Sequence, residues 1–111
     1  MNNTLPLKKN ADFRKLYTKG SSMASKYVVF FWLKNRYNYN RAGFVASKKV
    51  GKSVIRNKAR RLMKESFRTY EKRTKSGYDF IFIARQTIKN ATYKDVRKAM
   101  DYLLRKSKMM K

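Results

Sequence analysis

The chain of 111 residues contains no cysteine and no histidine. Without cysteine it has neither a disulfide framework nor a thiolate metal site. Without histidine it lacks the commonest general base and the commonest metal ligand found in proteins. We therefore predict no catalytic residue, no metal site and no cofactor bound by the protein.

Acidic residues are also scarce, with six of them against 30 lysines and arginines, for a net charge of +24. The acids are scattered and form no carboxylate cluster of the kind that holds two metal ions. Such an excess of positive charge is informative about binding partners rather than about the fold, and it implies a polyanionic partner. The polyanion is nucleic acid or an anionic membrane surface. A membrane role would need an amphipathic helix with free apolar groups, and the apolar stripes here serve better as core.

Long apolar runs are missing as well. The longest, Tyr27 to Leu33, is far too short to span a bilayer, and the N-terminus has no apolar signal-peptide core. We expect a cytoplasmic protein. A hydrophobic fraction of 42% is too high for a disordered basic tail. The length suits a single domain over 1–111, with an extended segment at 1–9 and a mobile basic tail at 106–111.

The most informative stretch is Ser47 to Arg68, where we predict a helix from Ser53 to Arg73 after a glycine-containing loop at Lys49 to Lys52. At 100° per residue its side chains separate into two faces. The apolar face carries Ile55, Ala59, Leu62, Met63, Ser66, Phe67 and Tyr70. The opposite face carries Arg56, Asn57, Arg60, Arg61, Lys64 and Arg68.

Like charges at i,i+4 on that second face repel by about 0.2–0.5 kcal/mol per pair. A solvated basic face is the bland alternative. Because the arginines are sorted to one side and lack acidic neighbours, we favour a surface for a polyanion.

The remaining pattern predicts an α+β sandwich of order α-β-β-α-β-α. Its first helix lies between an Asn10 cap and Gly20. Strands are predicted at Tyr27–Leu33, Arg41–Ser47 and Tyr78–Arg85, with a hairpin loop at 35–40 between the first two. A last helix starts at a capping-box-like Thr92-Tyr93-Lys94-Asp95. Its core stripe is Val96, Ala99, Met100, Leu103 and Leu104.

Aromatic residues gather in the first of these strands, which is apolar on both faces. One face, with Val28, Phe30 and Trp32, is predicted to line a cleft beneath the first helix. Aromatic rings in a basic groove stack against single-stranded bases, at about 1–3 kcal/mol each. For Trp32 a place in the cleft and a place in the core remain equal alternatives.

Four motifs together resemble the bacterial ribonuclease P protein family. The segment from Arg56 through Glu65 is similar to its arginine-asparagine-arginine motif, and Ser47–Val54 is similar to the segment before it. Leu7–Phe13 looks like the family's N-terminal signature, and Asp79–Arg85 like its last strand. The resemblance covers about residues 5–107. Lys58 and Lys64 stand where relatives commonly carry arginine, which keeps the charge and loses bidentate geometry.

The resemblance implies a ribonucleoprotein endonuclease that removes the 5′ leader of precursor tRNA. Its RNA subunit is implied to carry the catalytic site and Mg²⁺. The partners would be that RNA and precursor tRNA, with no membrane and no DNA. It also implies a ribosomal protein S5 domain 2-like fold with a left-handed βαβ crossover, and for Phe13 and Tyr17 a place in the leader cleft.

The predicted site residues form two groups. The leader cleft takes Phe13, Tyr17, Val28 and Phe30. Contacts to the catalytic RNA are expected from Lys48, Lys49, Lys52, Arg56, Asn57, Lys58, Arg60, Arg61, Lys64 and Arg68.

Composition is also compatible with a ribosomal or other structural RNA-binding protein, or with a DNA architectural protein. The four ordered motifs weigh against the first alternative. A DNA architectural protein would require a dimer and a minor-groove arm, and neither is visible in the sequence.

Overall fold

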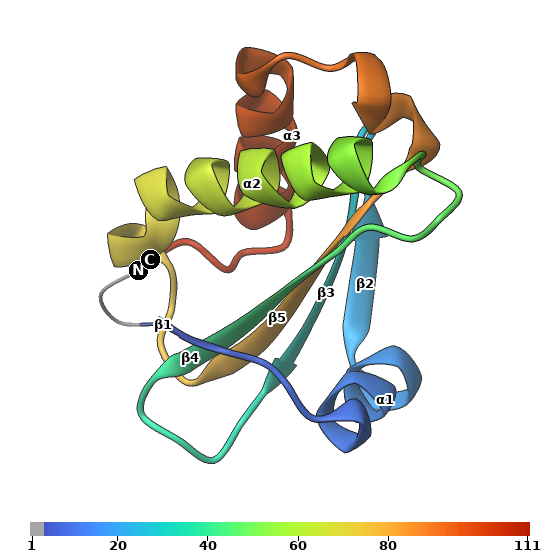
Figure 1. Cartoon of the computed structure of the whole chain (residues 1–111). Coiled ribbons are helices and arrows are strands. Elements are labelled where there is room, and N and C mark those ends of the chain that lie inside the picture. Colours follow the sequence, from blue (N-terminus) through green and yellow to red (C-terminus); the bar gives the residue numbers. More distant parts are fainter. Residues whose placement is uncertain (1–3) are drawn as a thin grey trace.

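A five-stranded sheet of order β1-β4-β5-β3-β2 carries the fold in the computed structural model, which describes residues 4–111 (Figure 1). The two outer strands are short and the three inner ones longer. Their bounds are Thr4–Pro6 for β1, Ser21–Ala24 for β2, Val28–Lys34 for β3, Asn40–Val45 for β4 and Tyr78–Ala84 for β5.

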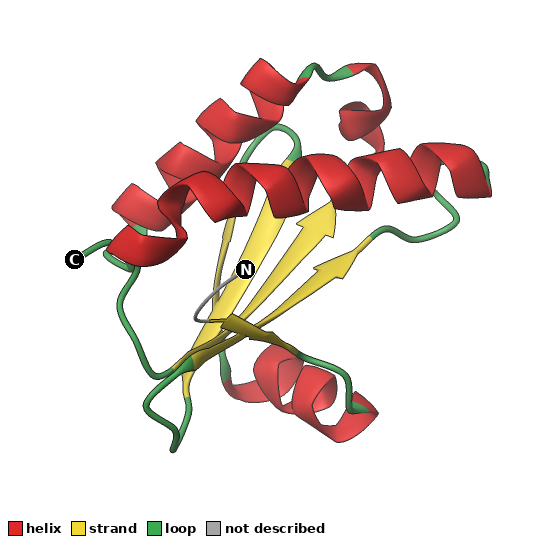
Figure 2. Ribbon diagram, turned by 60° about the vertical axis from the view of Figure 1, so that its left-hand side comes forward, coloured by secondary structure: helices red, strands yellow, loops and turns green. Residues whose placement is uncertain are grey.

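Helices cover both faces of this sheet. Figure 2 shows α2 and α3 on one face and α1 on the other. Short 3-10 turns follow α2 and β5. The helices are α1 at Asn10–Lys19, α2 at Ser53–Tyr70 and α3 at Tyr93–Lys106, and the turns are η1 at Glu71–Arg73 and η2 at Gln86–Asn90.

The predicted α+β class and element order are confirmed, with β1 and β2 added at the two edges. The predicted hairpin at 35–40 is wrong, because β5 lies between β3 and β4. It pairs antiparallel with β3 and parallel with β4. A strand that is apolar on both faces suits this central position, and the parallel pair requires α2 as its crossover. The hand of that crossover stays a prediction.

The larger core lies beneath α2 and α3. Phe30, Phe67, Phe80 and Phe82 are fully buried there, and the rings of Phe30 and Phe82 stack with centroids 4.7 Å apart. Both predicted helix stripes are buried, apart from a half-buried Ile55. The capping box at the start of α3 is confirmed, with the Thr92 side chain accepting from the Asp95 N–H and the Asp95 carboxylate accepting from the Thr92 N–H.

A smaller core lies under α1 and joins Leu7, Leu16 and Ile81. The predicted Asn10 cap is wrong: the cap position is Lys9, and no side chain caps the helix. The helix is held instead by the burial of Leu16 and by an ion pair of 3.2 Å between Asp12 and Arg41 of β4. Tertiary contacts thus replace the missing cap.

The two terminal segments are part of the fold. Thr4–Pro6, in the segment predicted to be extended, forms β1 parallel to β4; residues 1–3 of that segment lie outside the described residues. The prediction of a mobile tail at 106–111 is wrong, because Met109 is buried. The Lys75 N–H also donates to the Met109 carbonyl at 2.7 Å, and Met110 bridges to Thr74.

Candidate nucleic-acid interface

The loop before α2 places its lysines in solvent by burying one apolar residue. Val50 is buried, while Lys48, Lys49 and Lys52 are exposed. Gly51 has φ +150°, a conformation that favours glycine, and a Cβ there would lie 3.0 Å from the Ile55 side chain. The glycine therefore allows the chain to turn directly into the helix.

The outer surface of α2 and this loop form what we call the basic face: Lys48, Lys49, Lys52, Arg56, Asn57, Arg60, Arg61, Lys64 and Arg68. Arg56 and Arg60 are half-buried and the other seven are exposed. Lys58 is exposed too, but it lies about 200° around the helix from Arg56 and points away from the centre of this face. The predicted contacts are thus brought together, with Lys58 at the margin.

Arg60 is held in place rather than extended into solvent. Its Nη2 donates to the Asn57 Oδ1, and its Nη1 donates to the Ala46 carbonyl at 3.4 Å. Asn57 therefore helps to orient the Arg60 guanidinium. Arg61 has a weaker partner, since its Nε lies 4.0 Å from the exposed Glu65 carboxylate. Such an exposed pair contributes little and exchanges readily for another anion.

Arg56 has a hydrogen-bond donor without an acceptor. Its Nε is shielded from solvent and has no partner among residues 4–111. A buried donor without a partner costs about 1–3 kcal/mol.

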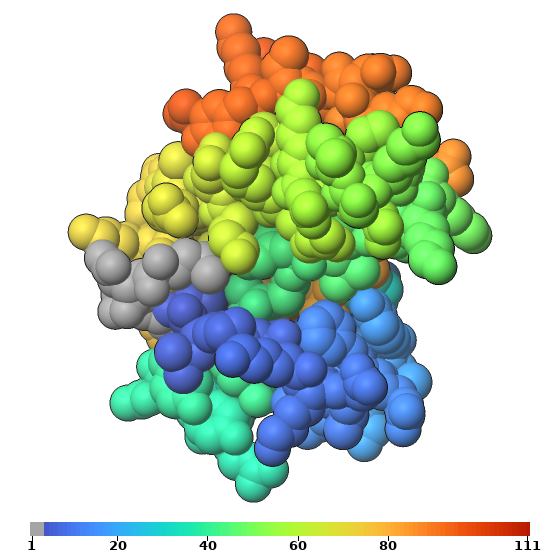
Figure 3. Space-filling model, in the orientation of Figure 1, coloured from blue at the N-terminus to red at the C-terminus, as the bar shows by residue number. Residues whose placement is uncertain are grey.

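A cleft separates α2 from the N-terminal segment, and Figure 3 shows it as a hollow between the two. Its volume is about 260 Å³. The lining residues come from both sides: Pro6, Leu7, Phe13, Ala42, Gly43, Phe44, Arg60 and Lys64. The Lys64 ammonium lies 5.9 Å from the centroid of the Phe44 ring. One wall is thus part of the basic face, and the floor is aromatic.

Gly43 lets Phe13 rest on the sheet. A Cβ at this position would lie 2.8 Å from the Phe13 Cζ and 2.9 Å from its Cε1. No side chain fits between the strand and the ring without displacing the ring. Because Gly43 has no side chain, the Phe13 ring can lie directly against β4 in the cleft.

A row of three aromatic rings is formed by Phe13 and Tyr17 of α1 and Phe31 of β3. The centroids of Phe13 and Tyr17 are 6.4 Å apart, and those of Tyr17 and Phe31 are 5.2 Å apart and edge-on. Tyr17 is 44% exposed, and partial burial raises the pKa of its hydroxyl. Phe31, from β3, was missed by sequence reasoning. The alternation of side chains along the strand could have found it, had the strand face under α1 been known.

The placement of Val28 and Phe30 in this cleft is wrong. Both are fully buried on the opposite face of the sheet, in the core beneath α2 and α3. Trp32 lies on that same face, half-buried and stacked on Phe30 at 5.1 Å, which favours the core alternative for it. The strand is apolar on both sides, so its sequence does not show which face meets α1.

Over residues 4–111, no group of three or more acidic side chains is arranged to hold a metal ion. The same residues contain no helix that is both long and apolar enough to cross a membrane.

The fold and the basic face define an RNA-binding α+β protein. The family model for Ribonuclease P matches residues 1–108. The ribonuclease P protein component of Alkaliphilus oremlandii (strain OhILAs) is 50% identical over 104 residues, covering 94% of this chain and 91% of the relative. That of Clostridioides difficile (strain 630) is 48% identical over 107 residues, covering 96% and 94%.

Solved structures agree with these relatives. The RNase P protein of Staphylococcus aureus superposes with a TM-score of 0.88 at 34% identity, covering 96% of this chain and 97% of that one. That of Thermotoga maritima superposes with a TM-score of 0.80 at 30% identity, covering 90% and 96%. The chain belongs to the ribonuclease P protein family, whose members are protein components of an endoribonuclease of tRNA processing.

Proposed function

We propose that the basic face docks the catalytic RNA of ribonuclease P while the cleft holds the single-stranded 5′ leader of precursor tRNA. One observation carries the proposal: Arg60 and Lys64 belong to the basic face and also line the cleft against Phe13. A strand in the cleft would thus lie directly beside RNA bound on the helix. Binding both favours substrate over product, because product lacks the leader.

The acidic residues support a division of labour in which the RNA subunit, with its Mg²⁺, performs cleavage in the cytoplasm. Asp12 and Asp79 are paired with Arg41, and Asp101 with Arg105. Glu65 faces Arg61, and Asp95 caps α3. Glu71 is buried. One Glu71 oxygen has no hydrogen-bond partner among the described residues, but no group of three or more acidic side chains comes together in residues 4–111. This arrangement offers no carboxylate cluster for two metal ions.

The leader contact is tested in the reconstituted holoenzyme with Phe13→Ala and Phe31→Ala. Each should weaken binding of leader-bearing precursor by about 1–3 kcal/mol, because a base loses its stacking partner. Affinity for tRNA without a leader should hardly change. Equal losses for the two substrates would sink the assignment.

Phe30→Ala is the matched control from the same strand, since Phe30 is fully buried. It should cost about 3–5 kcal/mol of folding stability. The folded fraction should bind both substrates normally.

The location of the chemistry is tested with protein purified free of RNA. It should not cleave precursor tRNA at any Mg²⁺ concentration, and adding the RNA subunit should restore cleavage at the leader junction. High Mg²⁺ and salt should partly replace the protein, since both screen phosphate repulsion. Site-specific cleavage by the protein alone would overturn this division of labour.

A further inference from the structure

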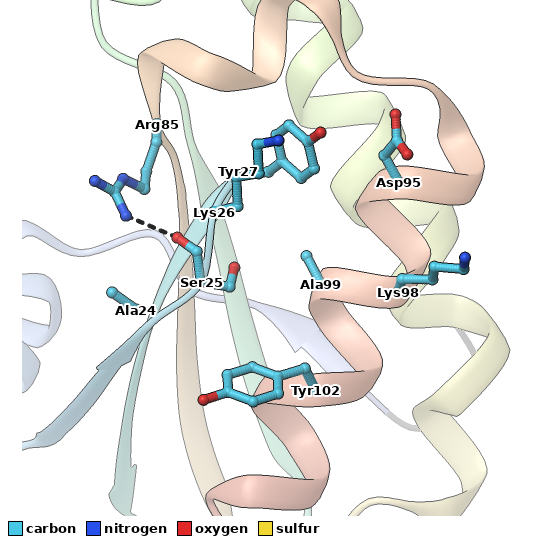
Figure 4. Close-up of a pocket in the computed structure, with 9 residues that line it drawn as sticks. All are labelled: Ala24, Ser25, Lys26, Tyr27, Arg85, Asp95, Lys98, Ala99 and Tyr102. Carbon is cyan, nitrogen blue, oxygen red and sulfur yellow. Dashed lines mark hydrogen bonds between the residues drawn. The ribbon is translucent and has the colours of Figure 1, made fainter.

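A second cavity lies at the opposite edge of the sheet from the leader cleft. Its volume is about 500 Å³, within the range of small-molecule sites. It opens between the β2–β3 turn, the end of β5 and α3 (Figure 4). Its lining residues are Ala24, Ser25, Lys26, Tyr27, Arg85, Asp95, Lys98, Ala99 and Tyr102. None of them lines the leader cleft or belongs to the basic face.

Two tyrosines define the shape of this cavity. Figure 4 shows Tyr27 and Tyr102 toward its two ends, with the small side chain of Ala99 between them. Tyr27 is half-buried and packs against the main core, which holds its ring in place. Tyr102 is 49% exposed on α3. A flat ring entering beside Ala99 would therefore find the exposed ring of Tyr102 at one end of the cavity and that of Tyr27 at the other.

Three cations, Lys26, Arg85 and Lys98, line the cavity together with these rings. The Lys26 ammonium lies 5.4 Å from the centroid of the Tyr27 ring. Arg85 is fixed by a hydrogen bond of 2.8 Å from its Nη1 to the Ser25 carbonyl. Asp95 is the only acid lining the cavity, and its Oδ2 accepts the Thr92 N–H at 2.9 Å. Three positive charges against one engaged carboxylate favour an anion beside the rings.

The position of the cavity separates it from the RNA contacts proposed above. The leader cleft is lined by residues of β1 and β4, whereas Ala24 and Tyr27 belong to β2 and the turn before β3. Strands β1 and β4 lie at one edge of the sheet, and β2 and β3 lie at the other. A nucleic-acid segment in one site is therefore not the segment in the other.

We propose that this cavity binds one unpaired nucleotide of RNA. Its base would stack on the exposed Tyr102 beside Ala99, with Tyr27 at the far end of the cavity, and its flanking phosphates would meet Lys26, Lys98 and Arg85. Aromatic surfaces bordered by cations are what unstacked bases require. This proposal depends on the proposed function in one respect. It takes the nucleotide to come from an RNA of the assembled enzyme.

The first test titrates the full chain with the oligonucleotide rU5 and follows amide NMR shifts. Shifts should cluster in the β2–β3 turn and around Tyr102. Tyr102→Ala should weaken this binding by about 5- to 150-fold, as the loss of one stacked base implies. Tyr93→Ala, which removes an exposed tyrosine outside the cavity on the same helix, should leave it unchanged. Equal effects of the two variants, or shifts confined to α2 and α1, would refute the site.

The second test uses the absence of cysteine from the natural chain. Lys98→Cys, carrying a short photo-crosslinker, should crosslink to a discrete unpaired nucleotide in the holoenzyme. Lys106→Cys on the same helix should give a different, weaker pattern. If an assembled holoenzyme shows no crosslink above the Lys106→Cys level, the cavity proposal falls and the proposed function stands. If the crosslink forms while the leader test fails, the cavity proposal holds and the leader assignment falls.

Discussion

Arg41 and Asp79 stand opposite each other in the parallel pair of β4 and β5 and are joined by two hydrogen bonds. The Arg41 Nε donates to one Asp79 oxygen at 2.8 Å, and its Nη2 donates to the other at 2.6 Å. A further nitrogen reaches Asp12 of α1 at 3.2 Å. The Asp79 bond is the main cause of a raised Arg41 pKa. One guanidinium thus links two strands to the helix that carries Phe13 and Tyr17.

Asp79→Ala should destabilise the fold, because it leaves the largely buried Arg41 with Asp12 alone. The side chains of Arg41 and Asp79 are 19% and 7% exposed. Removing one partner of a buried pair costs about 3–5 kcal/mol, and we expect the lower end of that range in urea unfolding. Asp101→Ala, which breaks the exposed pair with Arg105, should cost under about 1 kcal/mol. Equal costs for both variants would contradict the anchoring role of Arg41.

Gly43→Ala should displace the Phe13 ring from the floor of the cleft. The new Cβ would clash only with the outer end of that ring, which can swing away, while the Leu7 Cβ lies at an ordinary contact distance of 3.7 Å. The expected stability loss is therefore modest, at about 1–3 kcal/mol for an overpacked site. Holoenzyme affinity for leader-bearing precursor should fall, while affinity for leaderless tRNA stays constant. A variant that binds both substrates like the natural protein would show that the position of Phe13 does not matter.

Arg56→Ala combined with Arg60→Ala should weaken binding to the catalytic RNA. The slope of log affinity against log salt should fall by about 1.4–1.8 if both residues contact phosphate. The fold should survive, since neither side chain belongs to the core. Lys34→Ala with Arg36→Ala removes the same charge from the end of β3 and the loop after it and serves as the control. A slope that falls equally in both double variants would indicate a general effect of net charge.

The capping box of α3 predicts a pH dependence of stability. The hydrogen bond from the Thr92 N–H holds the pKa of Asp95 below its ordinary value. A carboxylate whose pKa is depressed by folding stabilises the folded state above its unfolded pKa, about 3.9, and loses that effect as the pH falls through the folded value.

Asp95→Asn should therefore unfold at lower temperature than the natural chain at pH 7. The difference should shrink below about pH 4. Thermal unfolding by circular dichroism across this range measures it. A difference that stays the same at pH 7 and pH 2 would show that the charge of Asp95 plays no part.

Helix faces and charge could be predicted from the order of the residues alone. On α2 and α3 the apolar side chains recur with the helical period while charged groups occupy the other side, so burial follows directly from sequence. The capping box of α3 is equally local, because Thr92 and Asp95 are three residues apart. Such features depend on neighbours along the chain.

Strand partners and the faces of the sheet depend on distant residues instead. Phe30 and Phe31 are adjacent aromatics of one strand, and an alternation of period two places them on opposite faces without saying which face meets α1. The insertion of β5 between β3 and β4 and the docking of Met109 likewise involve contacts across the fold. The three-dimensional packing therefore decides that Phe31 lies under α1 beside Tyr17 while Phe30 lies in the main core, because only one face of β3 is covered by α2 and α3.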